Sequence, residues 1–186
     1  MNRKTIDSLV SYIGLALAVV LLGAGILASV ASSFVNEQVT NQLTEQKITM
    51  PTKEAVAAQK FAQADADALA PYSGLAMTTG DQAYAFAEHY IKVHMAGIAG
   101  GKTYEEVSSE YMAALKTAPT APETAALGQQ RMSLFMGDTL RGLLLNAYAF
   151  GTVGKIAGFA AIGAYIAAGV LLLLSFLGFR HARRVE

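Results

Sequence analysis

The chain contains no cysteine and only three histidines among its 186 residues. Without cysteine it forms no disulfide, and redox chemistry through thiols is excluded. Neither sign of charge dominates, because 14 basic residues balance 14 acidic ones, and no basic cluster with interleaved aromatic residues is present. A protein that binds nucleic acid carries such a basic footprint. We therefore expect no nucleic acid partner, and a domain that holds together without disulfides.

Charged residues are missing altogether from two long stretches of the chain. The apolar runs 9–35 and 156–179 contain no Asp, Glu, Lys or Arg. A helix that rises about 1.5 Å per residue needs roughly 20 apolar residues to cross a hydrocarbon core of about 30 Å. Both runs are longer than that. The sequence therefore predicts two transmembrane helices, 9–35 and 156–179, with the polar segment 36–155 between them.

The first apolar run also has features of a cleaved signal peptide. Arg3 and Lys4 precede it, and the small residues of Ser29-Val30-Ala31 lie near its end. The apolar core of a signal peptide is about 7 to 15 residues long, and this run exceeds that length. We therefore interpret the run as a transmembrane helix that is retained.

The orientation follows from where the basic residues lie. Bases outnumber acids in the short tails, 1–8 and 180–186, whereas acids outnumber bases in the segment 36–155. Lys and Arg close to a span are retained on the cytoplasmic side. We expect a multi-pass plasma-membrane protein with both termini in the cytoplasm and the central segment as an extracytoplasmic domain. The bases expected to anchor the spans and meet the head groups of membrane lipids are Arg3, Lys4, Arg180, Arg183 and Arg184.

The segment between the spans shows helical signals rather than strand signals. Thr103 and Glu106 match a capping box at the start of one helix, and Thr79 or Asp81 caps another. The sequence predicts an all-α membrane protein, in which two transmembrane helices bracket a helical extracytoplasmic domain without strands. Helices in that domain are expected over about 36–45, 53–69, 81–95, 104–115 and 123–150.

Small residues recur at intervals of four in both spans. In lipid, helices associate through close packing, and rows of small residues let the backbones approach each other. Such rows fit three arrangements: the two spans packing on each other, self-association, or docking to another membrane protein. The residues are Ala24, Ala28 and Ser32 in the first span, and Gly154, Gly158, Ala160, Ala164 and Ala168 in the second.

The two histidines of the central segment do not match a metal-binding pattern. His89 and His94 are five positions apart, which turns the second side chain by about 140° on a helix. Zinc commonly takes three or four nitrogen or sulfur ligands, and non-haem iron takes two histidines and a carboxylate on one face. Glu88 instead has Lys92 four residues later, as in an ordinary surface pair. We expect no metal, no cofactor and no catalytic site.

An apolar stripe with two methionines lies on the predicted helix 123–150. Methionine sulfur is a soft ligand for copper, but apolar residues at helical spacing are far more often packing positions. We interpret the stripe as part of the core of the extracytoplasmic domain. Its residues are Met132, Phe135, Met136, Thr139, Leu140 and Leu143.

Several segments of the chain resemble a known group of membrane proteins. They are QLTEQKITMP after the first span, GDQAYAFAEHYIKVHMA, GGKTYEEVS, and LRGLLLNAYAFGTVG before the second span. In this combination the chain resembles an uncharacterised family of two-pass membrane proteins of actinobacteria, whose members often carry an automatic label of aromatic-ring-opening dioxygenase. The resemblance implies a Gram-positive plasma membrane and a helical outer domain, and it implies no established activity and no functional residues.

Two functions remain compatible with the sequence. The first is a non-enzymatic accessory or scaffold subunit that binds protein partners, or copies of itself, through its outer helical domain and the small-residue faces of its spans. The second is an extracytoplasmic domain that binds or senses a lipid or small apolar ligand between its helices. A monomer recovered alone contradicts the first function, and a solidly packed interior contradicts the second.

Overall fold

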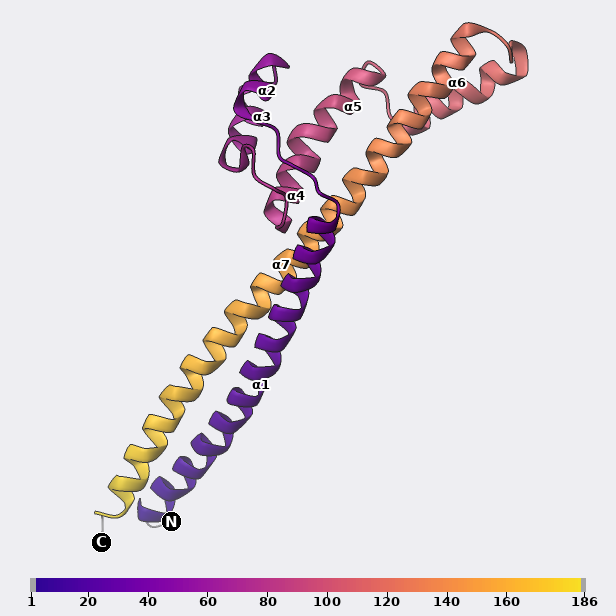
Figure 1. Ribbon diagram of the computed structural model, residues 1–186. Helices are drawn as coiled ribbons and strands as arrows, with labels where there is room; N and C mark the ends of the chain where they lie inside the picture. The colour runs from indigo at the N-terminus through magenta and orange to yellow at the C-terminus, as the bar shows by residue number, and fades with distance from the viewer. Residues whose placement is uncertain (1–2, 185–186) are drawn as a thin grey trace. The chain divides into compact units, whose positions relative to one another are not determined.

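A computed structural model describes residues 3–184, and the outermost residues of both predicted tails, 1–2 and 185–186, lie outside the described part. The prediction of an all-α fold is confirmed: two long apolar helices flank a region of shorter helices (Figure 1). The chain divides into two compact units. One consists of the described residues up to Glu37 and from Thr152 onward, and the other is Gln38–Gly151.

The first unit is a pair of antiparallel helices. It contains most of α1 (Arg3–Glu45) and the second half of α7 (Pro122–Ala182), which run side by side (Figure 1). The ring centroids of Tyr12 and Phe179 lie 4.9 Å apart, and the hydroxyl oxygens of Ser29 and Tyr165 lie 3.0 Å apart. Both helices are long and apolar enough to cross a membrane, and only 11% and 17% of their most apolar windows are buried. Such low burial is unlike the core helix of a soluble protein.

The second unit contains the shorter helices. The range 53–69, predicted as one helix, forms two, because the chain breaks near Lys60, which has a φ of +53°. A residue with positive φ cannot continue a right-handed helix. The elements of the second unit, besides the ends of the two long helices, are α2 (Lys53–Ala58), α3 (Gln63–Leu69), the 3₁₀ turn η1 (Ala70–Tyr72), α4 (Gly80–Phe86), the π-helical turn η2 (Ala87–Ile91), α5 (Lys92–Ile98) and α6 (Tyr104–Thr117).

Two capping boxes fix where α4 and α6 begin. The Thr79 hydroxyl accepts a hydrogen bond from Gln82 N, and the Gln82 side chain accepts from Thr79 N at 3.0 Å. The predicted box before α6 is confirmed, because Thr103 N donates to a carboxylate oxygen of Glu106 at 2.7 Å. The backbone N–H of Thr103, with its hydroxyl, holds the pKa of Glu106 below its ordinary value.

One short antiparallel contact departs from the expectation of a domain without strands. Thr49 and Ala76 form an isolated β-bridge, in which Met50 N donates to Leu75 O and Met77 N donates to Ile48 O, both at 2.9 Å. The bridge ties the segment after α1 to the segment before α4. The buried side chains of the second unit include Val39, Leu43, Met50, Val56, Leu69, Met77, Phe86, Ile91, Val107, Leu134 and Leu144.

Candidate functional site

The contact between the two helices of the first unit follows a seven-residue repeat of small residues. A spacing of 3.5 residues per turn is that of a left-handed coiled coil. The repeated residues are all buried or half-buried, and we call them the seam. They are Ser11, Ala18, Gly25 and Ser32 on α1, and Gly154, Ala161, Ala168, Ser175 and Ala182 on α7.

Serine side chains of the seam lie over glycines of the opposite helix. A Cβ on Gly14 would be 2.5 Å from Ser175 Oγ, and a Cβ on Gly158 would be 3.0 Å from Ser32 Oγ. Ser32 also donates a hydrogen bond to the backbone carbonyl of Gly154 at 2.8 Å. The missing side chains therefore let the two backbones approach closely, which is the means by which helices associate in lipid.

The small residues predicted from the interval of four divide into two groups. Ala28, Ser32, Gly154, Gly158, Ala164 and Ala168 are buried or half-buried, whereas Ala24 and Ala160 are exposed. Four residues turn a helix by about 40° more than one full turn, so a row at that interval drifts off a straight seam, whereas seven residues fall about 20° short of two turns. Contacts of Ala24 and Ala160 with another helix stay a prediction.

The basic residues predicted to anchor the spans lie at one end of the helix pair. Arg3 and Lys4 begin α1, Arg180 lies in the last turn of α7, and Arg183 and Arg184 follow that helix. All five are exposed. Bases in the last turn also interact favourably with the negative end of the helix dipole.

The two histidines of the second unit have separate partners. His89 Nδ1 lies 2.8 Å from Asp65 Oδ1, which links the π-helical turn to α3. His94 Nδ1 donates to Tyr90 O at 2.7 Å, and its ring packs edge-on against Phe61. Within residues 3–184, no group of three or more His, Cys, Asp or Glu side chains could hold a metal ion.

A charged cluster joins the π-helical turn to α7. Glu88 accepts hydrogen bonds from Lys92 Nζ at 3.0 Å and from Arg141 Nε at 3.0 Å, and Arg141 Nη2 makes a further close contact with the same carboxylate. Burial disfavours the ionised form of Glu88, but the hydrogen bonds from Lys92 and Arg141 outweigh it and hold the pKa below its ordinary value. The arrangement ties the π-helical turn to α7 and keeps this carboxylate ionised.

The methionine stripe on α7 does not form the core, so that interpretation was wrong. Met132, Phe135, Met136 and Leu143 are 53% to 57% exposed, and Phe150, which continues the stripe, is 60% exposed. We call these five residues the α7 apolar face.

The side of α7 that packs within the second unit carries two buried leucines and Gly137. Leu134 and Leu144 are buried there, with 2% and 0% exposure. A Cβ on Gly137, on the same side, would be 2.7 Å from the sulfur of Met95. A neighbouring helix thus supplies the bulky side chain at this contact. A count of the apolar residues on α7 alone therefore predicts that the exposed face is the buried one.

A groove of about 240 Å³ lies beside the α7 apolar face. It is lined by Tyr104 of α6 and by Arg131, Met132 and Phe135 of α7. Arg131 donates to the hydroxyl of Tyr104 at 2.9 Å and to that of Ser108 at 3.0 Å, so its guanidinium is held in place. The face therefore combines exposed apolar side chains with a fixed positive charge at its edge.

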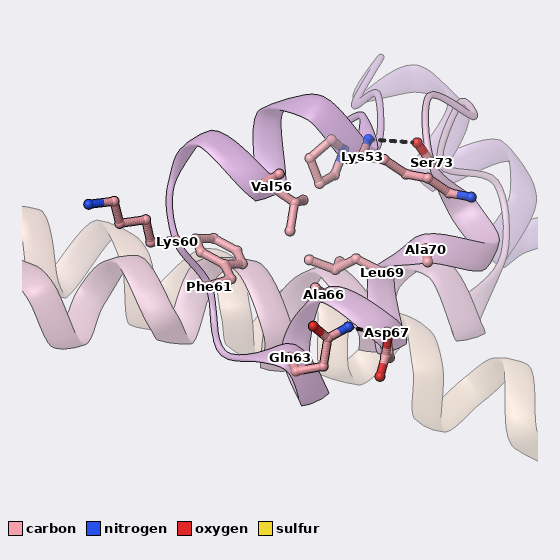
Figure 2. Close-up of a pocket in the computed structure, with 12 residues that line it drawn as sticks. Lys53, Val56, Lys60, Phe61, Gln63, Ala66, Asp67, Leu69, Ala70 and Ser73 are labelled. Atoms are coloured by element: carbon pink, nitrogen blue, oxygen red, sulfur yellow. Dashed lines mark hydrogen bonds between the residues drawn. The ribbon is translucent and has the colours of Figure 1, made fainter.

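A second cavity, of about 350 Å³, lies between α2 and α3. Figure 2 shows Val56, Phe61 and Leu69 pointing into the space between the two helices, whereas Lys60 points away from it. Lys53 N donates to Ser73 Oγ at 3.0 Å at one edge of the cavity. Sequence reasoning missed this cavity, because it results from the break near Lys60 within the range predicted as one helix.

Comparison with known proteins identified no relative of this chain. No family model, no curated protein and no solved structure matches this chain.

Proposed function

We propose that this chain is a non-enzymatic integral membrane protein that acts as an accessory or scaffold subunit and binds a protein partner, or a second copy of itself, through the α7 apolar face. The observation that carries the proposal is the exposure of Met132, Phe135, Met136, Leu143 and Phe150 on one side of a helix. Exposed apolar surface of this kind is typical of interaction sites, and methionine-rich surfaces adapt well to partner side chains.

The proposal places this face outside the membrane. Met132 precedes the predicted span 156–179 by a helical distance of about 36 Å along α7. Hydrocarbon therefore does not cover the far end of the face. Asp138 is exposed on the same stretch of helix, about 120° around from the centre of the face, which also suits an aqueous setting.

The membrane arrangement is part of the same proposal. We place the helix pair across a plasma membrane, with both termini in the cytoplasm and the second unit outside. The excess of bases in the tails supports this orientation. Partners of the spans themselves would meet their outer surfaces, where Ala24 and Ala160 are exposed.

Site-specific crosslinking in the native membrane tests the proposal. A photoreactive benzoyl-phenylalanine replaces Phe135 or Met136 in the tagged full-length chain, cells are irradiated, and the extract is analysed by mass under denaturing conditions. We expect a discrete adduct whose mass identifies a second copy or another protein.

The matched control places the same photoreactive residue at Asp138, which is also exposed on α7 but lies about 120° around the helix from the centre of the face. It is expected to give no adduct of that mass. Adducts of equal yield from all three positions, or none from Phe135 and Met136 with the protein recovered as a lone monomer in mild detergent, would rule the proposal out.

The cavity between α2 and α3 supports a second candidate function, the binding of a small apolar ligand. Its volume of about 350 Å³ is within the range of small-molecule sites, and Val56 of α2 and Leu69 of α3 give it an apolar lining. Val56→Phe fills the cavity, whereas Ala58→Phe places the same ring on the exposed side of α2. If the cavity binds ligand, native mass spectrometry shows dodecanoate bound to the wild type and Ala58→Phe, but not to Val56→Phe.

A further inference from the structure

The groove of about 240 Å³ between α6 and α7 carries a positive charge that no acid of the described chain pairs with. The charge belongs to Arg131, which lines the groove and is half-buried. Within residues 3–184, the ion pairs join other residues, and none includes Arg131. A guanidinium keeps its positive charge in proteins. The groove therefore presents a permanent charge that is available to an anion.

Neutral groups of α6 hold this guanidinium in place. Nε of Arg131 donates to the Ser108 hydroxyl at 3.0 Å, and Nη2 donates to the Tyr104 hydroxyl at 2.9 Å. The central carbon of the guanidinium lies 5.4 Å from the ring centroid of Tyr104 and 5.7 Å from that of Tyr111. These contacts orient the charge before a ligand arrives, so little side-chain entropy is lost on binding.

Several hydrogen-bond donors remain for a ligand. A guanidinium has five N–H donors, and the bonds to Ser108 and Tyr104 leave Nη1 of Arg131 unused within the part of the chain that the structure describes. The Tyr104 hydroxyl accepts from Nη2, so its own proton can be donated in turn. Because the Tyr104 oxygen is 2.9 Å from Nη2, the donors of the two side chains lie close enough to meet one carboxylate.

The rest of the groove is apolar. Met132 and Phe135 line it beside the ring of Tyr104, and the ring centroids of Tyr104 and Phe135 are 6.0 Å apart. An aromatic ring packs favourably against such a surface. A phosphate monoester carries up to two negative charges near neutral pH, which a single base matches poorly. A carboxylate carries one charge and fits the planar fork of a guanidinium.

From this arrangement we infer that the groove binds a small aromatic carboxylate, with Arg131 as its counter-charge, Tyr104 as a further donor, and Phe135 and Met132 against its ring. The volume of about 240 Å³ is below the usual range for drug-sized ligands, which favours an acid with a single ring. Binding of such an acid needs no protein partner, so it is independent of the proposed function.

Fluorine NMR of the full-length protein in phosphatidylcholine nanodiscs tests this site, with empty nanodiscs as the background. The probes are para-fluorophenylacetate, its neutral amide, and trifluoroacetate, which is an acid without a ring. We expect para-fluorophenylacetate to bind with a Kd of about 1 mM or lower, and at least about tenfold more tightly than the amide, because the amide loses a charge-assisted hydrogen bond. Trifluoroacetate should also bind more weakly, since it has no ring to pack on Phe135.

Variants assign the contacts. Arg131→Gln is expected to weaken binding of para-fluorophenylacetate by at least about tenfold, and Tyr104→Phe, which keeps the ring, by about threefold. Lys116→Gln removes an exposed base of α6 that does not line the groove, and it should leave binding unchanged. Val56→Phe fills the separate cavity between α2 and α3 and should also leave binding unchanged.

Arg131→Gln also breaks two hydrogen bonds to α6, so circular dichroism checks that this variant is folded. Arg131→Lys keeps the charge without the fork and should bind the acid more weakly than wild type but better than Arg131→Gln. Equal binding of the acid and its amide by the wild type, or no binding of the acid up to about 10 mM, would overturn the inference whatever the variants do. Binding of trifluoroacetate as tight as that of the aromatic acid, or wild-type affinity in folded Arg131→Gln, would overturn it too.

Discussion

The hydroxyl of Ser175 occupies the space that a side chain on Gly14 would need. A Cβ built on Gly14 would lie 2.5 Å from Ser175 Oγ and 3.8 Å from Ser175 Cβ. Real Cβ atoms do not approach an oxygen that closely, so to admit a methyl group either the buried Ser175 hydroxyl must rotate or one of the two helices must move. The closest approach of α1 and α7 at this level thus depends on a glycine facing a serine.

Gly14→Ala is therefore expected to destabilise the helix pair by about 1–3 kcal/mol through overpacking. Circular dichroism of the purified protein in mild detergent, followed during heating, measures the effect as a lower unfolding midpoint. Gly23→Ala is the control, because nothing lies within 4 Å of a Cβ at Gly23. That variant should unfold at the wild-type temperature or slightly higher, since alanine favours helix by about 1 kcal/mol over glycine. Equal destabilisation by both changes would contradict this packing.

Truncation on the two sides of α7 distinguishes core from surface. Leu134→Ala removes a side chain that is 2% exposed and should cost about 2–5 kcal/mol. Met136→Ala removes one that is 56% exposed and should change the free energy of unfolding by no more than about 0.5 kcal/mol. Thermal unfolding of the two variants in the same detergent makes the comparison. If Met136→Ala were the more damaging change, the methionine stripe would be core after all.

The capping box before α6 should control the local stability of that helix. Thr103→Ala removes the acceptor for Glu106 N, and cap substitutions of this kind cost about 1 kcal/mol. Hydrogen exchange measured by mass spectrometry is expected to show faster exchange in the first turns of α6 and no change in α1. Thr117→Ala changes a threonine at the other end of the same helix, where no cap is lost, and should leave the exchange near residue 104 as in wild type.

The contact between Glu88 and Arg141 predicts a pH dependence with a definite sign. The pKa of Glu88 is lowered in the folded protein, so the contact contributes stability above the ordinary value of 4.5 and loses it as the pH falls through the lowered pKa. Glu88→Gln should therefore unfold at a lower temperature than wild type near neutral pH, and the difference should shrink in acid below that pKa. A difference between the two proteins that stays constant over the whole range would show that the charge of Glu88 is not involved.

Some of this structure follows directly from the sequence. The two long helices were predictable because the runs 9–35 and 156–179 exceed the length that crosses a bilayer, and the helix start at Thr103 because a threonine and a glutamate stand three residues apart. These signals are local and strong. Tertiary contacts do not need to be known to use them.

Other features depend on contacts that one-dimensional patterns do not contain. The π-helical turn 87–91 and the break near Lys60 have no glycine or proline to mark them. Helical periodicity on α7 shows that apolar faces exist, but not which one is covered, because covering depends on contacts such as that of Met95 with Gly137 on the opposite side. The contact between Asp7 and His181, 3.7 Å apart, likewise joins residues from the two ends of the chain.

The seven-residue spacing of the seam restricts how this helix pair can change in length. One extra residue between Ala18 and Gly25 would turn every following seam residue on α1 by about 100° and bring bulky side chains against α7. Seven extra residues in each helix would restore the same face with a deviation of about 20°. Each such addition lengthens the pair by about 10 Å. In the proposed membrane arrangement, the pair therefore matches bilayers of different thickness only in steps of that size, and smaller adjustments come from tilting.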